Sequence, residues 1–255
     1  GGGMDLGLCG GCDFLGRHYD RNGFEVIWAN EINPHACATY RLNLGEHIVE
    51  GDINACMGRL PVYADVVIGG FPCQDISING KMLGPAGKRS SLYTVIVETV
   101  SRLRPKVFVA ENVGSLLMKK HAAALQRILA DFTALGYDVT HHLYCAEKYG
   151  VPQTRSRVIF VGTRSDLPAF VPPEPCGAPP VTAREALEDL EGRPQDQAFS
   201  HVWSAAKVSG EQGNRHLVAD RPGYTIRAEC HGNIQFHYAL PRRISMREAD
   251  RKSVV

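Results

Sequence analysis

The sequence predicts an α/β fold built on a doubly wound, mostly parallel sheet, and three observations support this prediction. Over the first 165 residues, apolar runs of strand length alternate with amphipathic stretches of helix length. The hydrophobic share of 44% and the charged share of 22% are typical of an ordinary globular protein. A chain of 255 residues is long enough for one large domain, or for a core domain with a small second one.

Four buried strands are expected first. Each is an apolar run of strand length that leads into a polar or glycine-containing turn. Because helical stretches alternate with these runs, most neighbouring strands are expected to lie parallel. The runs cover residues 24–30, 47–53, 64–70 and 106–112.

Helices are expected between the strands. Asn33 can cap the first helix, and Pro34 suits its first position. Ser90 or Ser91 can cap the second, whose apolar residues recur at spacings of three and four and which has to end before Pro105. The remaining expected elements are an amphipathic helix at 122–135 and a closing pair of strands at 137–146 and 157–163.

The composition of the chain changes at residue 165. The following 16 residues are rich in proline and cannot continue a sheet. From about 180 to 240, one helix is expected at 182–190, and the rest is polar sequence dotted with glycine. We therefore divide the chain into a core domain at 1–164, a small second lobe at 165–240, and a segment at 241–255 that returns to the core domain.

Composition and charge exclude several classes of protein. No apolar run approaches the roughly 18 residues that span a bilayer, and no signal peptide is present. The eight cysteines form no even framework, which favours reduced thiols in a cytosol. The formal net charge is +1, so binding to a nucleic acid would need a local basic groove.

Reactive or polar residues stand at the ends of the four predicted strands. Glu31 ends the first strand, Asp52 the second and Glu111 the fourth, while Cys73 follows the third. For any one of them, a surface carboxylate or a packed thiol is the commoner explanation. Four at successive strand ends are hard to treat as chance, because such ends converge on one crevice of a doubly wound sheet.

A cysteine pair in the stretch LCGGC, residues 8–12, suggests a redox or zinc motif. Zinc usually takes four ligands, and no second pair of Cys or His follows at ligand spacing. We therefore interpret Cys9 and Cys12 as local helix or loop cysteines and expect no metal site.

Four motifs, in order along the chain, resemble those of a known family. They are GGFPCQD at 69–75, AENV at 110–113, YGVPQTRSRVIFVG at 149–162 and PRRISMREADR at 241–251. Their order and spacing match the S-adenosylmethionine-dependent DNA (cytosine-5) methyltransferases of restriction-modification systems over nearly the whole chain. The resemblance implies a Rossmann-like methyltransferase fold, with the lobe at 165–240 as a small irregular target-recognition region.

The resemblance also implies roles for the motif residues. Cys73 would be the nucleophile that adds to C6 of a flipped-out cytosine, so that C5 can take the methyl group. Glu111 would act at N3 of the base and, to donate there, would have to keep a proton, which burial favours. Arg157 would bind the base carbonyl O2, with Arg155 supporting the site.

S-adenosylmethionine is the implied cofactor and S-adenosylhomocysteine its product. A carboxylate at the end of a first strand suits ribose hydroxyls, and a second one suits the adenine amino group. The residues assigned to the cofactor are Gly1, Gly2, Gly3, Glu31, Ile32, Asp52, Ile53 and Pro72.

Double-stranded DNA is the implied partner. The polar stretch 74–89 has the composition of a loop that closes over DNA, and 221–243 mixes groups able to contact bases and phosphates. The residues assigned to DNA are Ser77, Lys81, Lys88, Arg89, Gln153, Thr225, Arg227 and Arg243. A monomer in the bacterial cytoplasm, paired with a restriction endonuclease, is expected.

The chain departs from the family pattern at both ends. It begins inside the glycine motif and diverges after Arg251, so we expect a fragment of a longer protein. Two related functions stay open, a tRNA cytosine-5 methyltransferase and a non-catalytic nucleic-acid-binding relative. The lobe at 165–240 favours DNA over tRNA. A nicotinamide oxidoreductase would need a Gly-x-Gly-x-x-Gly turn, and the glycines at the start lack that spacing.

Overall fold

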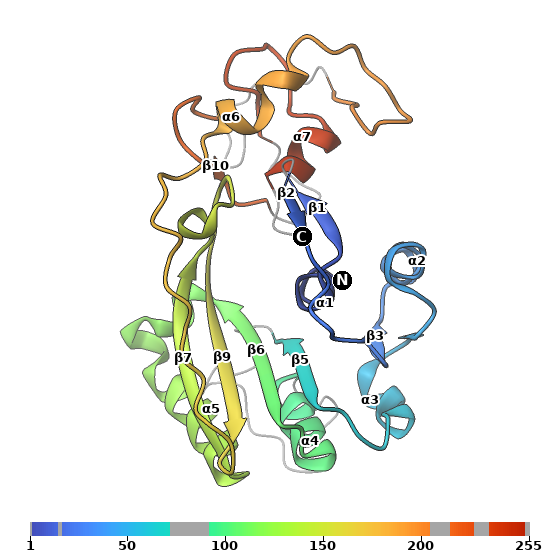
Figure 1. Cartoon of the computed structure of the whole chain (residues 1–255), viewed down its shortest axis with the longest axis vertical. Helices are drawn as coiled ribbons and strands as arrows, with labels where there is room; N and C mark the ends of the chain where they lie inside the picture. Colours follow the sequence, from blue (N-terminus) through green and yellow to red (C-terminus); the bar gives the residue numbers. More distant parts are fainter. Residues whose placement is uncertain (1, 15–16, 72–91, 205–214, 227–234, 253–255) are drawn as a thin grey trace. The chain divides into compact units, whose positions relative to one another are not determined.

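The computed structural model describes residues 2–14, 17–71, 92–204, 215–226 and 235–252 (Figure 1). They form two compact units. The first unit contains residues 1–10, 21–144 and 157–173, and the second contains residues 11–20, 145–156 and 174–255. In the described part of the chain, no helix has the length and apolar character that crossing a membrane requires.

The first unit carries a four-stranded mixed sheet with the strand order β5-β6-β9-β7. Its strands are β5 (Val66–Gly70), β6 (Val107–Val113), β9 (Ser156–Arg164) and β7 (Tyr137–Cys145). β5 and β6 pair in parallel, and β9 runs antiparallel to β6. The predicted α/β class is therefore confirmed, and the predicted closing pair of strands, β7 and β9, are neighbours.

A separate two-stranded parallel sheet joins β3 (Ala29–Glu31) to β4 (Ile48–Glu50). Both strands are shorter than the predicted runs. Only three residues of each strand pair, and Phe24 and Ile27, expected inside the first strand, are about half exposed. The β3–β4 ladder begins at Ala29, so the residues at 24–28 have no opposite residues in β4 to pair with.

Helices of the first unit begin and end close to the predicted positions. In α2 (Pro34–Leu44), Asn33 caps the helix as predicted, because its side chain accepts hydrogen bonds from the N–H groups of His35 and Ala36. α4 (Leu92–Leu103) ends before Pro105, and α5 (Ala122–Ala134) is followed by Gly136 at φ 81°. The shorter helices are α1 (Gly3–Cys9), α3 (Ile53–Cys56), η1 (Met57–Arg59), η3 (Gly114–Leu117) and η4 (Lys119–His121).

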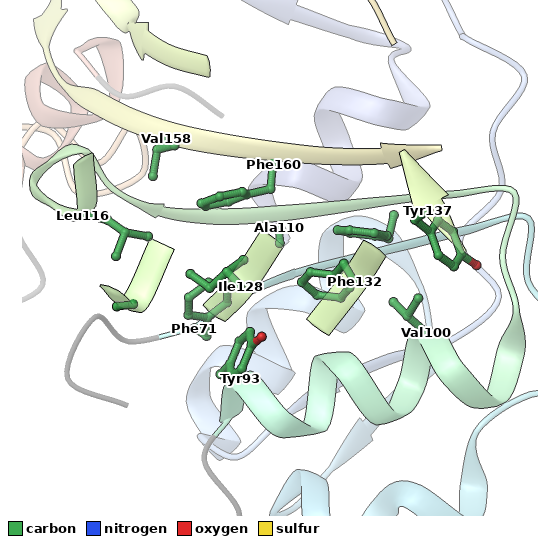
Figure 2. Close-up of a cluster of buried hydrophobic side chains, with 12 residues drawn as sticks. Phe71, Tyr93, Val100, Ala110, Leu116, Ile128, Phe132, Tyr137, Val158 and Phe160 are labelled. Atoms are coloured by element: carbon green, nitrogen blue, oxygen red, sulfur yellow. The ribbon is translucent and has the colours of Figure 1, made fainter. Parts of the chain in front are cut away.

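The core of the first unit lies between the four-stranded sheet and the helices α4 and α5 (Figure 2). Phe108 of β6 stacks on Phe132 of α5 with 4.1 Å between ring centroids, and Tyr93 of α4 meets Phe132 edge-on. Gly162 is paired with Phe108 across the sheet, and a Cβ there would lie 2.0 Å from the Phe108 ring. The absence of a side chain at Gly162 therefore leaves the space that the Phe108 ring occupies.

The second unit is held together by short helices and a two-residue ladder. Its elements are β1 (Cys12–Phe14), β2 (Arg17–Tyr19), η5 (Ala146–Tyr149), β8 (Gln153–Thr154), α6 (Ala183–Leu187), η6 (Glu188–Leu190), β10 (Gly223–Tyr224) and α7 (Met246–Arg251). α6 and η6 fill the predicted helix at 182–190, and Thr182 and Glu185 form a capping box at its start. Cys9 ends α1 and Cys12 begins β1.

The two units are not divided at the boundaries expected at residues 164 and 240. Residues 145–156 belong with the second unit, where β8 pairs in parallel with β10. Residues 241–255 also belong there: α7 packs against α6, and Arg251 forms an ion pair with Asp189. The expected return segment thus lies in the lobe, because its partners are in α6 and η6.

Candidate active site

Two predicted catalytic residues meet on the four-stranded sheet. The antiparallel register of β6 and β9 places Val113 opposite Arg157, and Glu111 lies two residues earlier on the same face of β6. Arg157 Nε donates to Glu111 Oε1 at 2.5 Å, and the two side chains are 23% and 28% exposed. A charged pair that is neither closed off nor fully solvated can still contact a ligand.

The end of β5 lies next to this pair. Gly70 is opposite Glu111 in the β5–β6 ladder, and a Cβ at Gly70 would lie 3.4 Å from Glu111 Oε2. The glycine therefore leaves room beside the carboxylate. In the sequence, the predicted nucleophile Cys73 is three residues beyond Gly70, the last residue of β5 and the one opposite Glu111.

Asn112 fixes the backbone that leads to that nucleophile. The alternation of β6 turns Asn112 toward the core, where it is 1% exposed, while Glu111 takes the other face. Its Nδ2 donates to the Phe71 carbonyl at 3.0 Å, and its Oδ1 accepts from the N–H of Val113. In the sequence, Asn112 is only a member of the AENV motif, and its role could not be predicted because its partner lies 41 residues away.

Carboxylates predicted to bind the cofactor stand at the ends of the paired strands β3 and β4. Glu31 ends β3, and its Oε1 accepts from the N–H groups of Ile32 and Asn33 at 2.9 and 3.0 Å. Asp52 follows β4 and caps α3, with its Oδ1 accepting from Asn54 N–H at 2.8 Å. Each carboxylate is thus oriented through one oxygen, and among the described residues the other oxygen accepts no hydrogen bond.

These residues fit the nucleoside part of S-adenosylmethionine. The ribose and the adenine amino group are hydrogen-bond donors, and the two oriented carboxylates have an oxygen each to accept from them. Ile32 is 65% exposed and Ile53 half-buried, so apolar surface is available beside both. Gly2 caps α1 at φ 92°, and a Cβ there would lie 2.8 Å from Leu44 Cδ1, so a side chain at this position would be strained.

Three residues predicted to bind DNA lie in the second unit. Gln153 is 2% exposed, and both ends of its amide bond backbone groups within that unit. Thr225 Oγ1 donates to the Thr154 carbonyl at 2.5 Å. The guanidinium of Arg243 lies 5.8 Å from the centroid of the Phe236 ring. Arg155 also belongs to this unit, and its backbone N–H donates to the Gln153 carbonyl.

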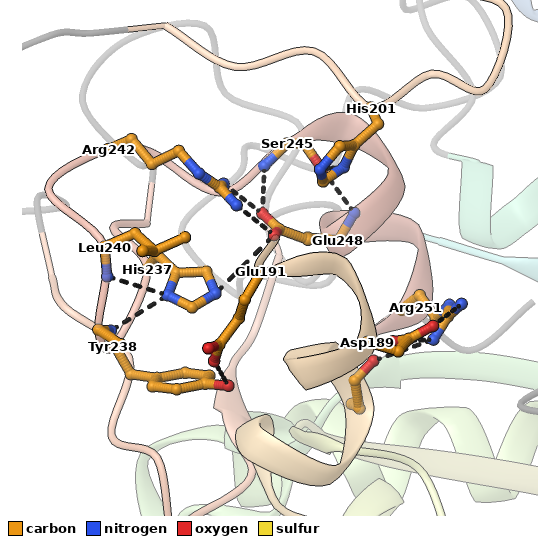
Figure 3. A network of polar contacts seen from close by, with 12 residues as sticks. Asp189, Glu191, His201, His237, Tyr238, Leu240, Arg242, Ser245, Glu248 and Arg251 are labelled. Carbon is orange, nitrogen blue, oxygen red and sulfur yellow. Dashed lines mark hydrogen bonds and ion pairs between the residues drawn. The ribbon is translucent and has the colours of Figure 1, made fainter. Parts of the chain in front are cut away.

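The last motif, residues 241–251, forms a buried ionic network (Figure 3). Arg242 binds Glu248 through two hydrogen bonds of 2.8 and 2.7 Å, and the side chains are 8% and 0% exposed. Ser245 caps α7 and donates its N–H to Glu248. Burial would raise the pKa of Glu248, but the donors from Arg242 and Ser245 hold that pKa below its ordinary value.

His237 completes this network as a neutral side chain. Its Nδ1 accepts from the N–H groups of Ala239 and Leu240, so the ring proton sits on Nε2, 3.8 Å from Glu248 Oε1. Burial lowers the pKa of His237, although the Glu248 carboxylate acts in the opposite direction. The network is a closed structural element, because its carboxylate oxygens already have donors.

Several predicted site residues lie outside the described part of the chain, so the structure says nothing of their positions. They are Gly1, Pro72, Cys73, Ser77, Lys81, Lys88, Arg89 and Arg227.

Comparisons with known proteins agree on one family. Residues 4–217 match the C-5 cytosine-specific DNA methylases. The chain is 40% identical to the Type II methyltransferase M.NgoFVII of Neisseria gonorrhoeae, over 96% of this chain and 75% of that protein. It is 34% identical to M.BbvI of Brevibacillus brevis, over 89% of this chain and 72% of that protein.

Solved structures share the fold. A prophage-encoded E. coli protein assigned as a DNA modification methyltransferase has a TM-score of 0.69 at 21% identity, over 98% of this chain and 84% of that chain. The S. pombe Dnmt2 methyltransferase has a TM-score of 0.54 at 17% identity, over 78% of this chain and 63% of that chain. At such identities the likeness concerns the fold alone. The match over residues 4–217 and the 40% identity to M.NgoFVII show that the chain belongs to the C-5 cytosine-specific DNA methylase family.

Proposed function

We propose that this chain transfers a methyl group from S-adenosylmethionine to C5 of cytosine in double-stranded DNA, as the modification enzyme of a Type II restriction-modification system in the bacterial cytoplasm. The observation that carries the proposal is the Glu111–Arg157 pair, 2.5 Å apart, at the point where β5 runs out toward Cys73. A carboxyl group and a guanidinium side by side match the N3 and O2 edge of a pyrimidine.

The chemistry assigns each residue a step. The thiolate of Cys73 adds to C6 of cytosine, and the displaced ring electrons move toward N3 and O2. When the base enters, the Glu111–Arg157 ion pair opens: Glu111 takes up a proton from solvent and supplies it at N3, while Arg157 donates to O2, so the added charge is neutralised where it develops. C5 is then an enamine carbon that can attack. S-adenosylmethionine, when bound, supplies an electrophilic methyl group on a sulfonium. Water or hydroxide takes the C5 proton, the thiolate of Cys73 leaves C6, and the N3 proton returns to Glu111, which restores the aromatic ring and frees Cys73.

The target base has to leave the duplex for this chemistry. In a duplex, the neighbouring base pairs cover C6 of a stacked cytosine, and rotating the base out costs roughly a few kcal/mol. The Asn112–Phe71 hydrogen bond supports this arrangement, because it fixes the backbone directly before the Pro72–Cys73 pair. A backbone fixed at Phe71 lowers the entropy that the following residues can lose when the flipped base arrives.

The second unit supports DNA over tRNA as the substrate. Apart from Arg242, which is buried in the closed network, its described residues hold five arginine–aromatic pairs, with each guanidinium carbon 4.5–5.8 Å from a ring centroid. Arginine and aromatic side chains on a folded lobe suit the phosphates and base edges of a duplex. The tRNA reaction stays the second candidate, because the same Glu111–Arg157 pair would serve it.

The test is methylation in a bacterium that lacks its own cytosine-5 methylation. Expression of the chain should produce 5-methylcytosine in one short sequence context, read by bisulfite sequencing of the host DNA and of its tRNA. Cys73→Ser should abolish the signal, while Cys176→Ser, at an exposed position, should leave it unchanged.

A covalent adduct tests the mechanism separately. Duplexes containing 5-fluorocytosine in that context should trap the chain, because fluorine at C5 cannot be lost as a proton. Methylation of tRNA alone would make the second candidate correct. The absence of methylation and of adduct in every context would rule out the catalytic proposal.

A further inference from the structure

A short segment of the second unit, Tyr224–Ile226, is held by two buried glutamine side chains. Gln235 Nε2 donates to the carbonyls of Tyr224 and Thr225 at 3.1 and 3.3 Å. Gln153 Oε1 accepts from the N–H of Ile226 at 3.3 Å. Gln235 and Gln153 are 6% and 2% exposed. Three consecutive residues that border no long strand or helix are thus fixed through their backbone.

Lys252 links the two glutamines. Its Nζ donates to Gln235 Oε1, and its carbonyl accepts from Gln153 Nε2. Lys252 is 0% exposed, and within the described residues its ammonium forms no ion pair. Burial lowers the pKa of Lys252 to about 7, with no carboxylate acting against it. We call Gln153, Gln235 and Lys252 the amide clamp.

Glycine at position 223 makes room for this lysine. A Cβ on Gly223 would lie 2.0 Å from Lys252 Cε and 2.6 Å from Nζ. Gly223 also pairs with Gln153 in the β8–β10 ladder, so the lysine side chain lies against the strand that leads into the held segment.

Stability does not explain a lysine at this place. A buried ammonium without a counter-ion is costly, and an apolar side chain of similar volume would be more stable. A fully bonded polar network can instead fix one conformation of the chain around it. The segment it fixes contains Thr225 and runs directly into Arg227, which are two of the residues expected to contact DNA.

We propose that Gln235 and Lys252 are positioning residues for DNA binding. They hold Tyr224–Ile226 extended along Gln153 and Thr154, so that the segment meets the duplex in a preformed shape. This inference rests on the proposed function, since it assumes duplex DNA as the partner. Preformed contacts lower the entropy lost on binding, so loosening the clamp raises the Kd for DNA without touching the reacting atoms.

The first experiment compares Lys252→Met with the wild-type chain. Methionine keeps the length of the side chain and removes the charge and the donor. Binding is measured by fluorescence anisotropy with a labelled pool of duplexes of random sequence, and stability by the melting temperature. We expect a higher melting temperature together with a five- to tenfold higher Kd. Lys148→Met, an exposed lysine in the same unit, is the control and should change neither.

Hydrogen exchange of the free chain measures how firmly the segment is held. If the clamp positions the segment for DNA, faster exchange at Ile226 should accompany a higher Kd; a purely structural role predicts no such link. The amide of Ile226 should exchange faster in Lys252→Met and in Gln235→Glu. The carboxylate of Gln235→Glu pairs with Lys252 but cannot donate to Tyr224 and Thr225, so its Kd should also rise. A Kd within twofold of wild type in both variants, or unchanged exchange at Ile226, would overturn the inference.

The outcome also separates this inference from the function on which it rests. A wild-type chain without affinity for any duplex would refute the proposed function, and with it any role of the clamp in DNA binding. A wild-type chain that binds duplexes, beside variants that bind equally well, would refute the clamp's role alone.

Discussion

Two arginine–carboxylate pairs stand in family motifs of this chain and differ in their surroundings. Arg157 and Glu111, on neighbouring strands of the first unit, are about a quarter exposed, and Arg157 Nε lies 2.5 Å from Glu111 Oε1. Arg242 and Glu248, in the second unit, are almost fully buried, and Glu248 also accepts from Ser245. A pair with solvent access can exchange its partner for a ligand, whereas a pair whose oxygens are all bonded holds the fold.

The largest effect expected is on activity, from Glu111→Gln. An amide cannot supply the proton at N3, so methylation should slow by roughly 100- to 10,000-fold. The free energy of unfolding should change by less than about 1 kcal/mol, because the pair is partly solvated. Single-turnover rates and urea unfolding measure the two quantities. Glu98→Gln, in an exposed pair with Arg102, is the control and should leave the rate unchanged.

Glu248→Gln should show the reverse pattern. Removing the carboxylate charge leaves Arg242 buried without a counter-ion, so the free energy of unfolding should fall by about 3–5 kcal/mol. Urea unfolding is the measurement. Asp189→Asn breaks an ion pair of the same unit whose aspartate is 54% exposed, and it should cost at most about 1 kcal/mol. Equal losses of stability in the two variants would contradict the distinction between solvent-accessible pairs and buried pairs whose oxygens are all bonded.

The effects of Asn112→Ala on activity and stability should lie between those of Glu111→Gln and Glu248→Gln. Asn112 is buried like Glu248, but it donates to the backbone carbonyl of Phe71, two residues before Cys73. Loss of its donor leaves the Phe71 carbonyl unpaired, at a cost of about 1–3 kcal/mol. The rate should fall as well, since the predicted nucleophile is then less well held. A variant that loses stability but keeps the full single-turnover rate would show that Asn112 acts on the fold alone.

The smallest effect is a pH dependence from His237. Its pKa is lower in the folded chain than its ordinary value of 6.5, so the unfolded chain binds more protons below that pH. Stability should therefore fall as the pH drops from about 6.5, by at most about 1.4 kcal/mol per pH unit. Melting temperatures between pH 7 and 5 test this, and His237→Gln should flatten the curve.

Two other groups titrate mainly outside that range, and repeating the series in Lys252→Met removes the part of the Lys252 titration that falls just below pH 7. The pKa of Glu248 is also lowered, so its share of the stability is lost only below its ordinary value of 4.5. Lys252 has a folded pKa of about 7 against an ordinary 10.5, so stability should rise with pH between these values. That rise should be absent from Lys252→Met.

Local patterns were enough to predict the elements that carry the open pair. The apolar run at 106–112 and the run at 157–163 predicted the strands β6 and β9, on which Glu111 and Arg157 lie. The side-chain oxygen of Asn33 predicted a helix start that the structure confirms. These features depend on residues within a few positions of each other, so the apolar periodicity of a strand and the cap of a helix can be recognised in one short stretch of sequence.

Contacts between distant segments could not be predicted in the same way. Asn112 and Phe71 are 41 residues apart, and Gln153 and Lys252 are 99 apart. Composition also gave no sign that residues 145–156 group with the second unit, where β8 pairs with residues 223–224. A side-chain amide gives no periodic signal, and its partner is chosen only when the chain has folded.

By itself, the sequence determined the family and the order of the main strands and helices of the first unit, and it predicted which side chains carry the chemistry. Apolar periodicity and helix caps depend on residues close together in the sequence, and reactive side chains are identified by residue type alone, so both can be recognised without the fold. The tertiary structure decided which carboxylate stays open and which is closed, and which buried amides hold Tyr224–Ile226. Those properties depend on burial and on partners far along the chain, because the energy of a polar group is set by what surrounds it.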